Sequence, residues 1–102
     1  MSFGNLAKMA QQMQAQMARV QAELAVLTVQ GSAGGGAVTA TATGKGDLIS
    51  IVIDPEVVDA ADVEMLQDLV TAAVNEALRA AHAETETRMA AVTGGLRLPG
   101  LG

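Results

Sequence analysis

The residues of this 102-residue chain that could catalyse a reaction or bind a metal are few and far apart. The single histidine, His82, stands among alanines, and the chain has no cysteine. Zinc sites are built from sets of His, Cys and carboxylate ligands, so the usual donors are missing. Ser2, Ser32 and Ser50 lie neither in a nucleophile-elbow motif nor near a base in the sequence. We predict a protein that is not an enzyme and has no catalytic residue, metal ligand, cofactor or small-molecule substrate.

The segment from Gly31 to Pro55 is rich in glycine, and its Gly34-Gly35-Gly36 run suggests a phosphate-binding loop. The run lacks the glycine-lysine-serine/threonine ending of such loops and does not lead into a helical pattern. A flexible turn or a close approach of two backbones is the better interpretation, because glycine has no Cβ.

The charge of the chain is −5, which argues at first against binding to phosphate groups. The acidity is confined to one block, however. Residues 54–76 carry seven carboxylates and no cation, whereas residues 1–27 carry two cations and one carboxylate. Residues 77–102 carry three arginines and two glutamates. Net charge alone therefore does not decide the partner.

Two segments have the periodicity of helices. Residues 5–27 place Leu6, Met13, Val20 and Leu27 seven residues apart, which predicts one apolar stripe that packs against another helix. Residues 59–92 repeat apolar side chains at i, i+3, i+4 and i+7, which is the clearest helical pattern in the chain. The acidic cluster falls in the first turns of this second helix, where Asp59, Asp62 and Glu64 are expected to cap it and keep it soluble. Residues 93–102 are expected to form a mobile tail.

Between the helices, three short strands are predicted at Leu27–Gln30, Ala37–Thr43 and Leu48–Ile53. The second alternates small apolar residues with threonine, the period of a half-buried strand. Residues 44–47 would make the tight reversal into the third strand, which Pro55 ends. The prediction is an α+β protein, residues 1–102 forming a single domain of helix, three-stranded antiparallel meander and helix.

The core that this order can enclose is thin. Phe3 is the only aromatic residue, and alanine and glycine make up much of the composition. A second copy of the chain would add the missing buried area, so we expect a homodimer. The sequence has no run of about 18 apolar residues, and the absence of cysteine fits a cytoplasmic protein without membrane contact.

Taken in order, these segments resemble the YbaB/EbfC family of small bacterial nucleoid-associated proteins. The similarity covers nearly the whole chain. It is carried by the Met- and Gln-rich first helix (KMAQQMQAQMARVQAEL), the Val29-Gln30-Gly31 exit, the AGGGAV turn, the IVIDP stop, the segment from Leu66 to Asn75, and the segment from Met89 to Gly95.

The resemblance implies a tweezer-like homodimer whose projecting helices grip double-stranded DNA with little sequence preference and help to organise the nucleoid. Charge then selects the residues for phosphate contact: Lys8 and Arg19 on the first helix, and Arg79 and Arg88 on the second. Gln12 and Gln16 could add hydrogen bonds. Lys45, in a turn, and Arg97, in the tail, are second choices.

Two hypotheses follow. In the first, the chain coats, bridges or compacts chromosomal DNA as a homodimer. In the second, it is a protein-interaction module that docks a replication or recombination factor through its Met-rich helix and does not touch DNA. With so few cations, the first hypothesis predicts weak and non-specific binding by one dimer.

Overall fold

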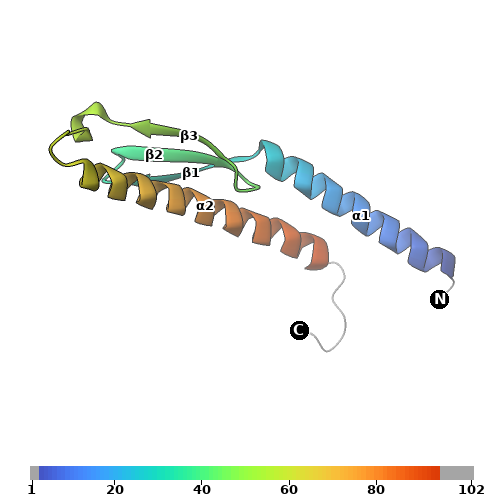
Figure 1. The fold of residues 1–102 in the computed structure, drawn as a ribbon. Coiled ribbons are helices and arrows are strands. Elements are labelled where there is room, and N and C mark those ends of the chain that lie inside the picture. Colours follow the sequence, from blue (N-terminus) through green and yellow to red (C-terminus); the bar gives the residue numbers. More distant parts are fainter. Residues whose placement is uncertain (1–2, 95–102) are drawn as a thin grey trace.

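A computed structural model of the chain describes residues 3–94, which form two long helices and one sheet (Figure 1). The observed order confirms the predicted fold of helix, three-stranded antiparallel sheet and helix. The elements are α1 (Phe3–Val26), β1 (Thr28–Ala33), β2 (Val38–Thr43), β3 (Leu48–Ile53), a short 3₁₀ turn η1 (Pro55–Val57) and α2 (Val63–Gly94).

The strands pair in the order β1-β2-β3, so β2 is the central strand and β3 is an edge. Val38, Ala40 and Ala42 of β2 are buried against Ala73 and Ala77 of α2. The threonines that alternate with them lie on the opposite face, as the period of two predicts. The register shifts between Thr41 and Ala42, where β2 pairs with β3 through an irregularity.

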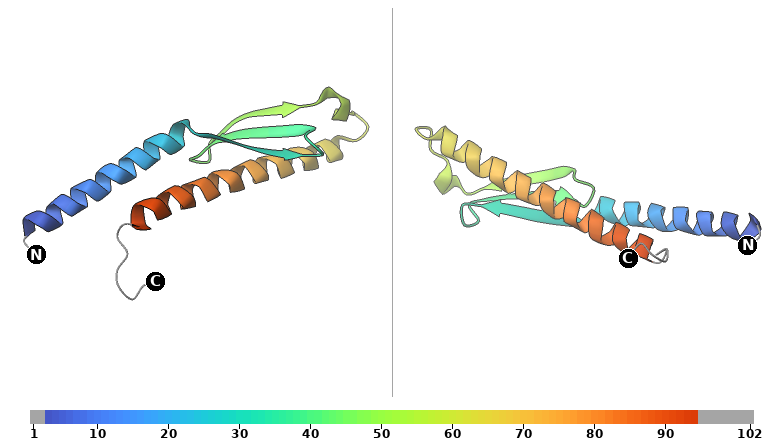
Figure 2. Two further views of the ribbon diagram at one scale, coloured as in Figure 1. Left: turned by 180° about the vertical axis from the view of Figure 1, so that it is seen from behind. Right: turned by 90° about the horizontal axis from the view of Figure 1, so that it is seen from below.

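α2 lies along one face of the sheet, over β1 and β2 but hardly over β3 (Figure 2). Glycine at position 31 permits this packing. A Cβ there would lie 2.2 Å from the backbone nitrogen of Ala77 and 2.5 Å from the carbonyl oxygen of Ala73. The sheet and helix backbones therefore touch, as small side chains allow.

β1 is longer than the predicted Leu27–Gln30, because it continues through Gly31 and Ser32 to Ala33. The glycine looked like a strand terminator in the sequence, but it is a point of contact with α2. The run Gly34-Gly35-Gly36 forms the following turn with positive φ at all three residues, a conformation that favours glycine.

α2 begins at Val63, four residues after the expected start at Asp59. Asp62 accepts a hydrogen bond from the backbone nitrogen of Met65 at 3.2 Å and so caps the helix. Asp59 instead caps the preceding turn, where it accepts from the nitrogen of Ala61 at 2.9 Å. The predicted capping of α2 is therefore confirmed for Asp62, whereas for Asp59 it was wrong, because this side chain bonds within the turn before the helix. The expected mobile tail lies outside the described residues except for positions 93 and 94, which belong to α2.

The molecule is elongated, with principal extents of 70 × 27 × 16 Å. Its radius of gyration is 19.8 Å, against about 13 Å for a compact chain of this length. The excess comes mainly from α1, which projects beyond the sheet (Figures 1 and 2).

Candidate nucleic-acid interface

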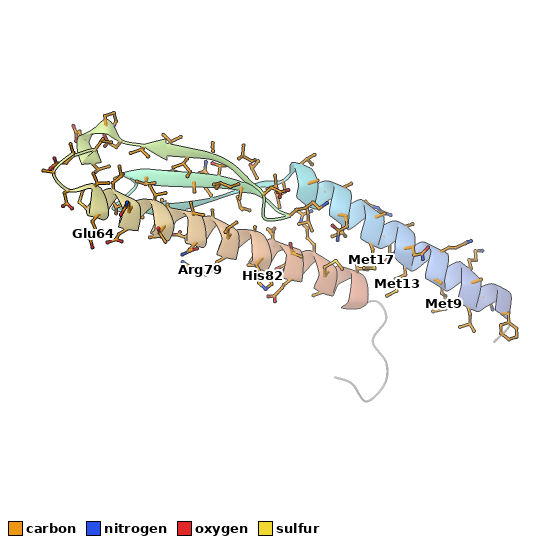
Figure 3. All side chains as sticks on the ribbon, in the orientation of Figure 1. Met9, Met13, Met17, Glu64, Arg79 and His82 are labelled. Carbon is orange, nitrogen blue, oxygen red and sulfur yellow. The ribbon has the colours of Figure 1, made fainter. Side chains whose placement is uncertain are left out.

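α1 forms an arm whose first two-thirds touch little else in the chain (Figure 3). From Phe3 to Arg19 only Met13 is even half-buried. The first buried residues are Val20 and Leu24. The apolar stripe that was predicted to pack on another helix therefore does so only at this end. Its outer part, which includes Met9, is exposed in the single chain.

The arm is attached to the body over its last two turns. Leu24 packs on the β2–β3 turn, where a Cβ at Gly44 would lie 2.9 Å from the carbonyl oxygen of Leu24. The next residue after the arm, Leu27, accepts a backbone hydrogen bond from Gly44 at 3.0 Å. α1 thus passes into β1 with no intervening loop, and its direction is set by this packing.

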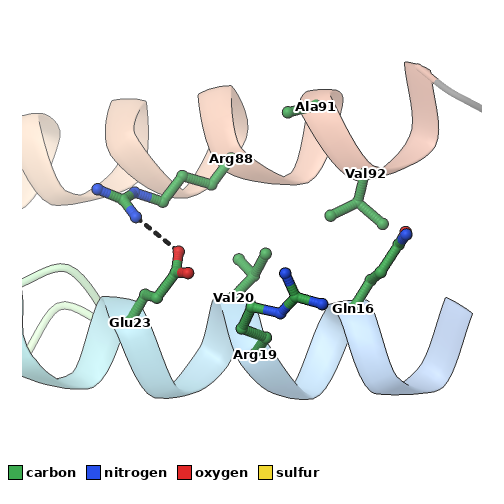
Figure 4. Close-up of a pocket in the computed structure, with 7 residues that line it drawn as sticks. All are labelled: Gln16, Arg19, Val20, Glu23, Arg88, Ala91 and Val92. Carbon is green, nitrogen blue, oxygen red and sulfur yellow. Dashed lines mark hydrogen bonds and ion pairs between the residues drawn. The ribbon is translucent and has the colours of Figure 1, made fainter. Parts of the chain in front are cut away.

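An ion pair also connects α1 to α2. The Nη1 atom of Arg88 lies 2.8 Å from Oε2 of Glu23 (Figure 4), and its Nε lies 3.9 Å from Glu84. The Nε atom is buried and has no hydrogen-bond partner among the described residues. Beside this pair is a pocket of about 270 Å³ between the helices, which Gln16, Arg19 and Val92 help to line.

Lys8, Gln12, Gln16 and Arg19 are all exposed on the arm. Their spacing of four, four and three residues puts them along one face of α1 over about 16 Å. They form a polar row, which lies beside the exposed apolar stripe rather than on it. The structure therefore brings the four α1 candidates together.

The two α2 candidates are separated. Arg88 follows Arg79 by nine positions, which is two and a half helical turns, so the two residues occupy opposite sides of α2. Arg88 faces α1 and is balanced by Glu23, whereas Arg79 is exposed and points away from the sheet (Figure 3). Contact of either residue with DNA stays a prediction, and the ion pair gives Arg88 a structural role as well. Arg97 lies outside the described residues.

Most of the acidic block is separated in space from the free cations, although its last carboxylate, Glu76, lies three residues before Arg79 on α2. Among residues 3–94, Lys8, Arg19, Lys45 and Arg79 form no ion pair, and all four are exposed. The carboxylates from Asp54 to Asp68 gather at the opposite end, around η1 and the start of α2 (Figure 3). Six residues of β3 at about 3.3 Å each put roughly 20 Å between that end and the β2–β3 turn. This exceeds the Debye length of about 10 Å at 0.1 M salt.

Sequence reasoning missed two features of the surface. The Glu23–Arg88 pair joins residues 65 positions apart, and no local pattern signals it. The exposure of β3 in the single chain was also missed, although the composition of the strand indicates that something should cover it. Five of the six residues Leu48–Ile53 are apolar, which is typical of a strand covered on both faces.

Other classes of site find no support in the described part of the chain. Across residues 3–94, no three His, Cys, Asp or Glu side chains are grouped as a metal ion would require. Neither described helix combines the length and hydropathy of a membrane span.

Several known proteins are similar to this chain in sequence or in fold. A nucleoid-associated protein of Acetivibrio thermocellus is 57% identical over 101 residues, which cover 98% of this chain and 89% of the relative. One of Clostridium novyi is 54% identical over 101 residues, covering 99% and 89%. The crystal structure of an uncharacterised Helicobacter pylori protein has the same fold, with a TM-score of 0.75 at 23% identity over 95% of this chain and 99% of that one. The model of the YbaB/EbfC DNA-binding family matches residues 1–96, and the chain belongs to this family.

Proposed function

We propose that this protein binds double-stranded DNA as a homodimer with little sequence specificity, and that it coats, bridges or compacts the chromosome in the cytoplasmic nucleoid. The observation that carries the proposal is the separation of charge along the molecule. Exposed cations on α1 and at the centre lie far from the carboxylates at the opposite end. Family membership and the names of the relatives support the same ligand.

The uncovered edge strand β3 supports a homodimer. Leu48, Ile49, Ile51 and Val52 are 37–65% exposed on an edge strand, and Val58 just beyond the strand is 57% exposed. An exposed apolar edge strand invites pairing with another chain. The single-chain core is also small, since Leu24 and Val38 are its largest fully buried side chains. A second copy packed on this strand would bury it and enlarge the core.

The polar row of α1 (Lys8, Gln12, Gln16 and Arg19) supports contact with the DNA backbone. Lysine and arginine attract phosphate, and glutamine can donate to phosphate or to base edges. With about four phosphate contacts per dimer, log K would fall against log salt concentration with a slope of roughly −3.6. That slope predicts weak binding by one dimer, so occupancy would come from many dimers or from bridging of two duplexes.

A titration of random duplex DNA at low salt, with a solution mass measured in parallel, tests the proposal. The wild type should bind and should have the mass of two subunits. The triple variant K8Q/R19Q/R79Q removes three free cations and leaves the Glu23–Arg88 pair in place, so it should bind much more weakly without losing its fold. Gln14→Ala, also on α1, is the matched control and should bind normally. A wild type that does not bind, or a mass of one subunit, would refute the proposal.

The exposed stripe of α1 favours a second candidate, in which the arm docks a protein partner. Leu6 and Met9 are each 46% exposed, and methionine adapts readily to different surfaces. Under this alternative the triple variant would be indistinguishable from the wild type in every DNA titration.

A further inference from the structure

The β2–β3 turn and α2 enclose a pocket that none of the residues on the polar row of α1 reaches. It has a volume of about 320 Å³ and is lined by the turn residues Gly44, Lys45 and Gly46 and by Leu78, Ala81, His82 and Thr85 of α2. The two sides are more than 30 residues apart in sequence, so only the fold brings them together. We propose that this pocket binds a backbone phosphate of duplex DNA through Lys45 and protonated His82.

The turn is held firmly enough to present a charged side chain in one place. Thr85 donates from its hydroxyl to the carbonyl of Gly44 at 2.9 Å, which ties the turn to α2. Within the turn, Gly46 donates to the carbonyl of Thr43 at 2.9 Å. Thr43 also accepts from the nitrogen of Asp47 through its hydroxyl at 3.2 Å. Lys45 therefore projects from a turn that hydrogen bonds hold in one conformation.

The residues that line the pocket favour an anion, although carboxylates stand close to both Lys45 and His82. No carboxylate belongs to its lining, and Lys45 forms no ion pair among the described residues. On α2, Oε1 of Glu86 lies 3.1 Å from Nε2 of His82, and Arg79 precedes His82 by three residues. Asp47 follows Lys45 on the turn, and Glu84 and Glu23 are occupied with Arg88.

The location also fits a ligand that is held by α1. Gly44 packs on Leu24 at the base of the arm, so the pocket adjoins the end of the arm. The length of β3 separates it from the acidic end. A duplex lying on the polar row of α1 would meet this pocket next along the molecule. This inference rests on the proposed function, and it adds a contact that depends on pH.

Histidine is the side-chain type that gains charge between pH 8 and pH 5, and His82 is the only histidine in the chain. Protonation would add a cation beside Lys45, although Glu86 would compete with phosphate for it. We therefore expect DNA affinity at fixed ionic strength to rise about two- to fivefold from pH 7.0 to pH 5.8, the size of one partly exposed ion pair. This interval lies below the range in which the α-amino group titrates.

Titration of random duplex DNA with wild type, H82Q and K45Q at both pH values tests the inference. H82Q should bind as the wild type does at pH 7.0 and should lose the gain at pH 5.8. K45Q should bind more weakly at both, with a salt slope shallower by about 0.9 per subunit. D47N is the matched control. It removes a negative charge from the same turn, whereas K45Q removes a positive one, so D47N should not weaken binding.

Two results would overturn the inference while leaving the proposed function intact. One is wild-type binding to DNA with H82Q and K45Q unchanged in affinity and pH dependence. The other is that millimolar inorganic phosphate binds the wild type but not K45Q, and that this phosphate does not compete with DNA. The pocket would then be a site for a small free anion. A wild type that does not bind DNA at all would instead refute the proposed function. Unaltered thermal unfolding of each variant shows that a change in binding is not a change in folding.

Discussion

Glu23 and Arg88 form an ion pair of 2.8 Å that joins the inner end of the α1 arm to α2. It lies beside the buried Val20 and Leu24, which provide the apolar contact between the arm and the body. The buried apolar side chains therefore attach the arm to the body, and the ion pair restricts the direction in which the arm projects from the body. The same pair neutralises one of the few arginines that could meet phosphate.

The first prediction concerns this pair. Both side chains are partly exposed, so the pair should contribute no more than about 1 kcal/mol to the free energy of unfolding. A double-mutant cycle of E23Q and R88Q, followed by urea unfolding, measures it. E23Q should also strengthen DNA binding, because it removes a carboxylate beside Arg19 and the closer of the two carboxylates that pair with Arg88. Weaker binding by E23Q would show that the direction of the arm matters more than the freed charge.

The second prediction concerns the contact between sheet and helix. Gly31→Ala should destabilise the fold by about 1–3 kcal/mol or more, because the added Cβ would overlap the α2 backbone and the packing would have to shift. Urea unfolding is the measurement. The neighbouring exposed residue supplies the control, since Ser32→Ala in the same strand should change the midpoint little. Equal stability of the two variants would contradict the close packing of β1 on α2.

The third prediction concerns the exposed strand β3. Ile49 is 54% exposed in the single chain, and burying a side chain of this size contributes about 1.5–3 kcal/mol. Ile49→Gln should therefore weaken subunit association by roughly tenfold or more, which sedimentation or mass photometry would detect. Thr28→Gln, on the exposed part of β1, should leave the mass at two subunits. If Ile49→Gln also leaves the mass unchanged, the partner does not lie on β3.

The fourth prediction concerns the start of α2. Asp62→Ala removes the side chain that caps the nitrogen of Met65, which should cost about 0.5–2 kcal/mol of stability. Asp68→Ala removes the same charge from an exposed position farther along the helix and should cost less. Thermal unfolding of the two variants distinguishes capping from a general effect of charge. Equal losses would mean that the hydrogen bond contributes nothing measurable.

Much of the fold could be predicted because its signals are local. The periodicity of three and four residues marked both helices, and alternation in Val38–Thr43 marked the central strand. The errors came where a residue serves a distant neighbour. Gly31 continues β1 because Ala73 and Ala77 lie against it, and the sequence near Gly31 carries no sign of them. Asp59 and Asp62 both looked like helix caps, and only the turn between them shows which one starts α2.

The candidate site divides in the same way. The row from Lys8 to Arg19 follows from spacing on one helix, so the sequence could place these residues together. The partner of Arg88, and the pocket that joins Lys45 to His82, depend on how α2 lies along the sheet and the arm. Tertiary packing of this kind leaves no mark in a window of neighbouring residues.

The salt dependence of DNA affinity tests the central claim most directly, namely that a few separated cations are enough to hold the double helix. The wild-type dimer should give a log–log slope of roughly −3.6, and K8Q/R19Q/R79Q should give a much flatter line at lower affinity. A slope that the triple variant leaves unchanged would contradict the claim, because binding would then not depend on these cations.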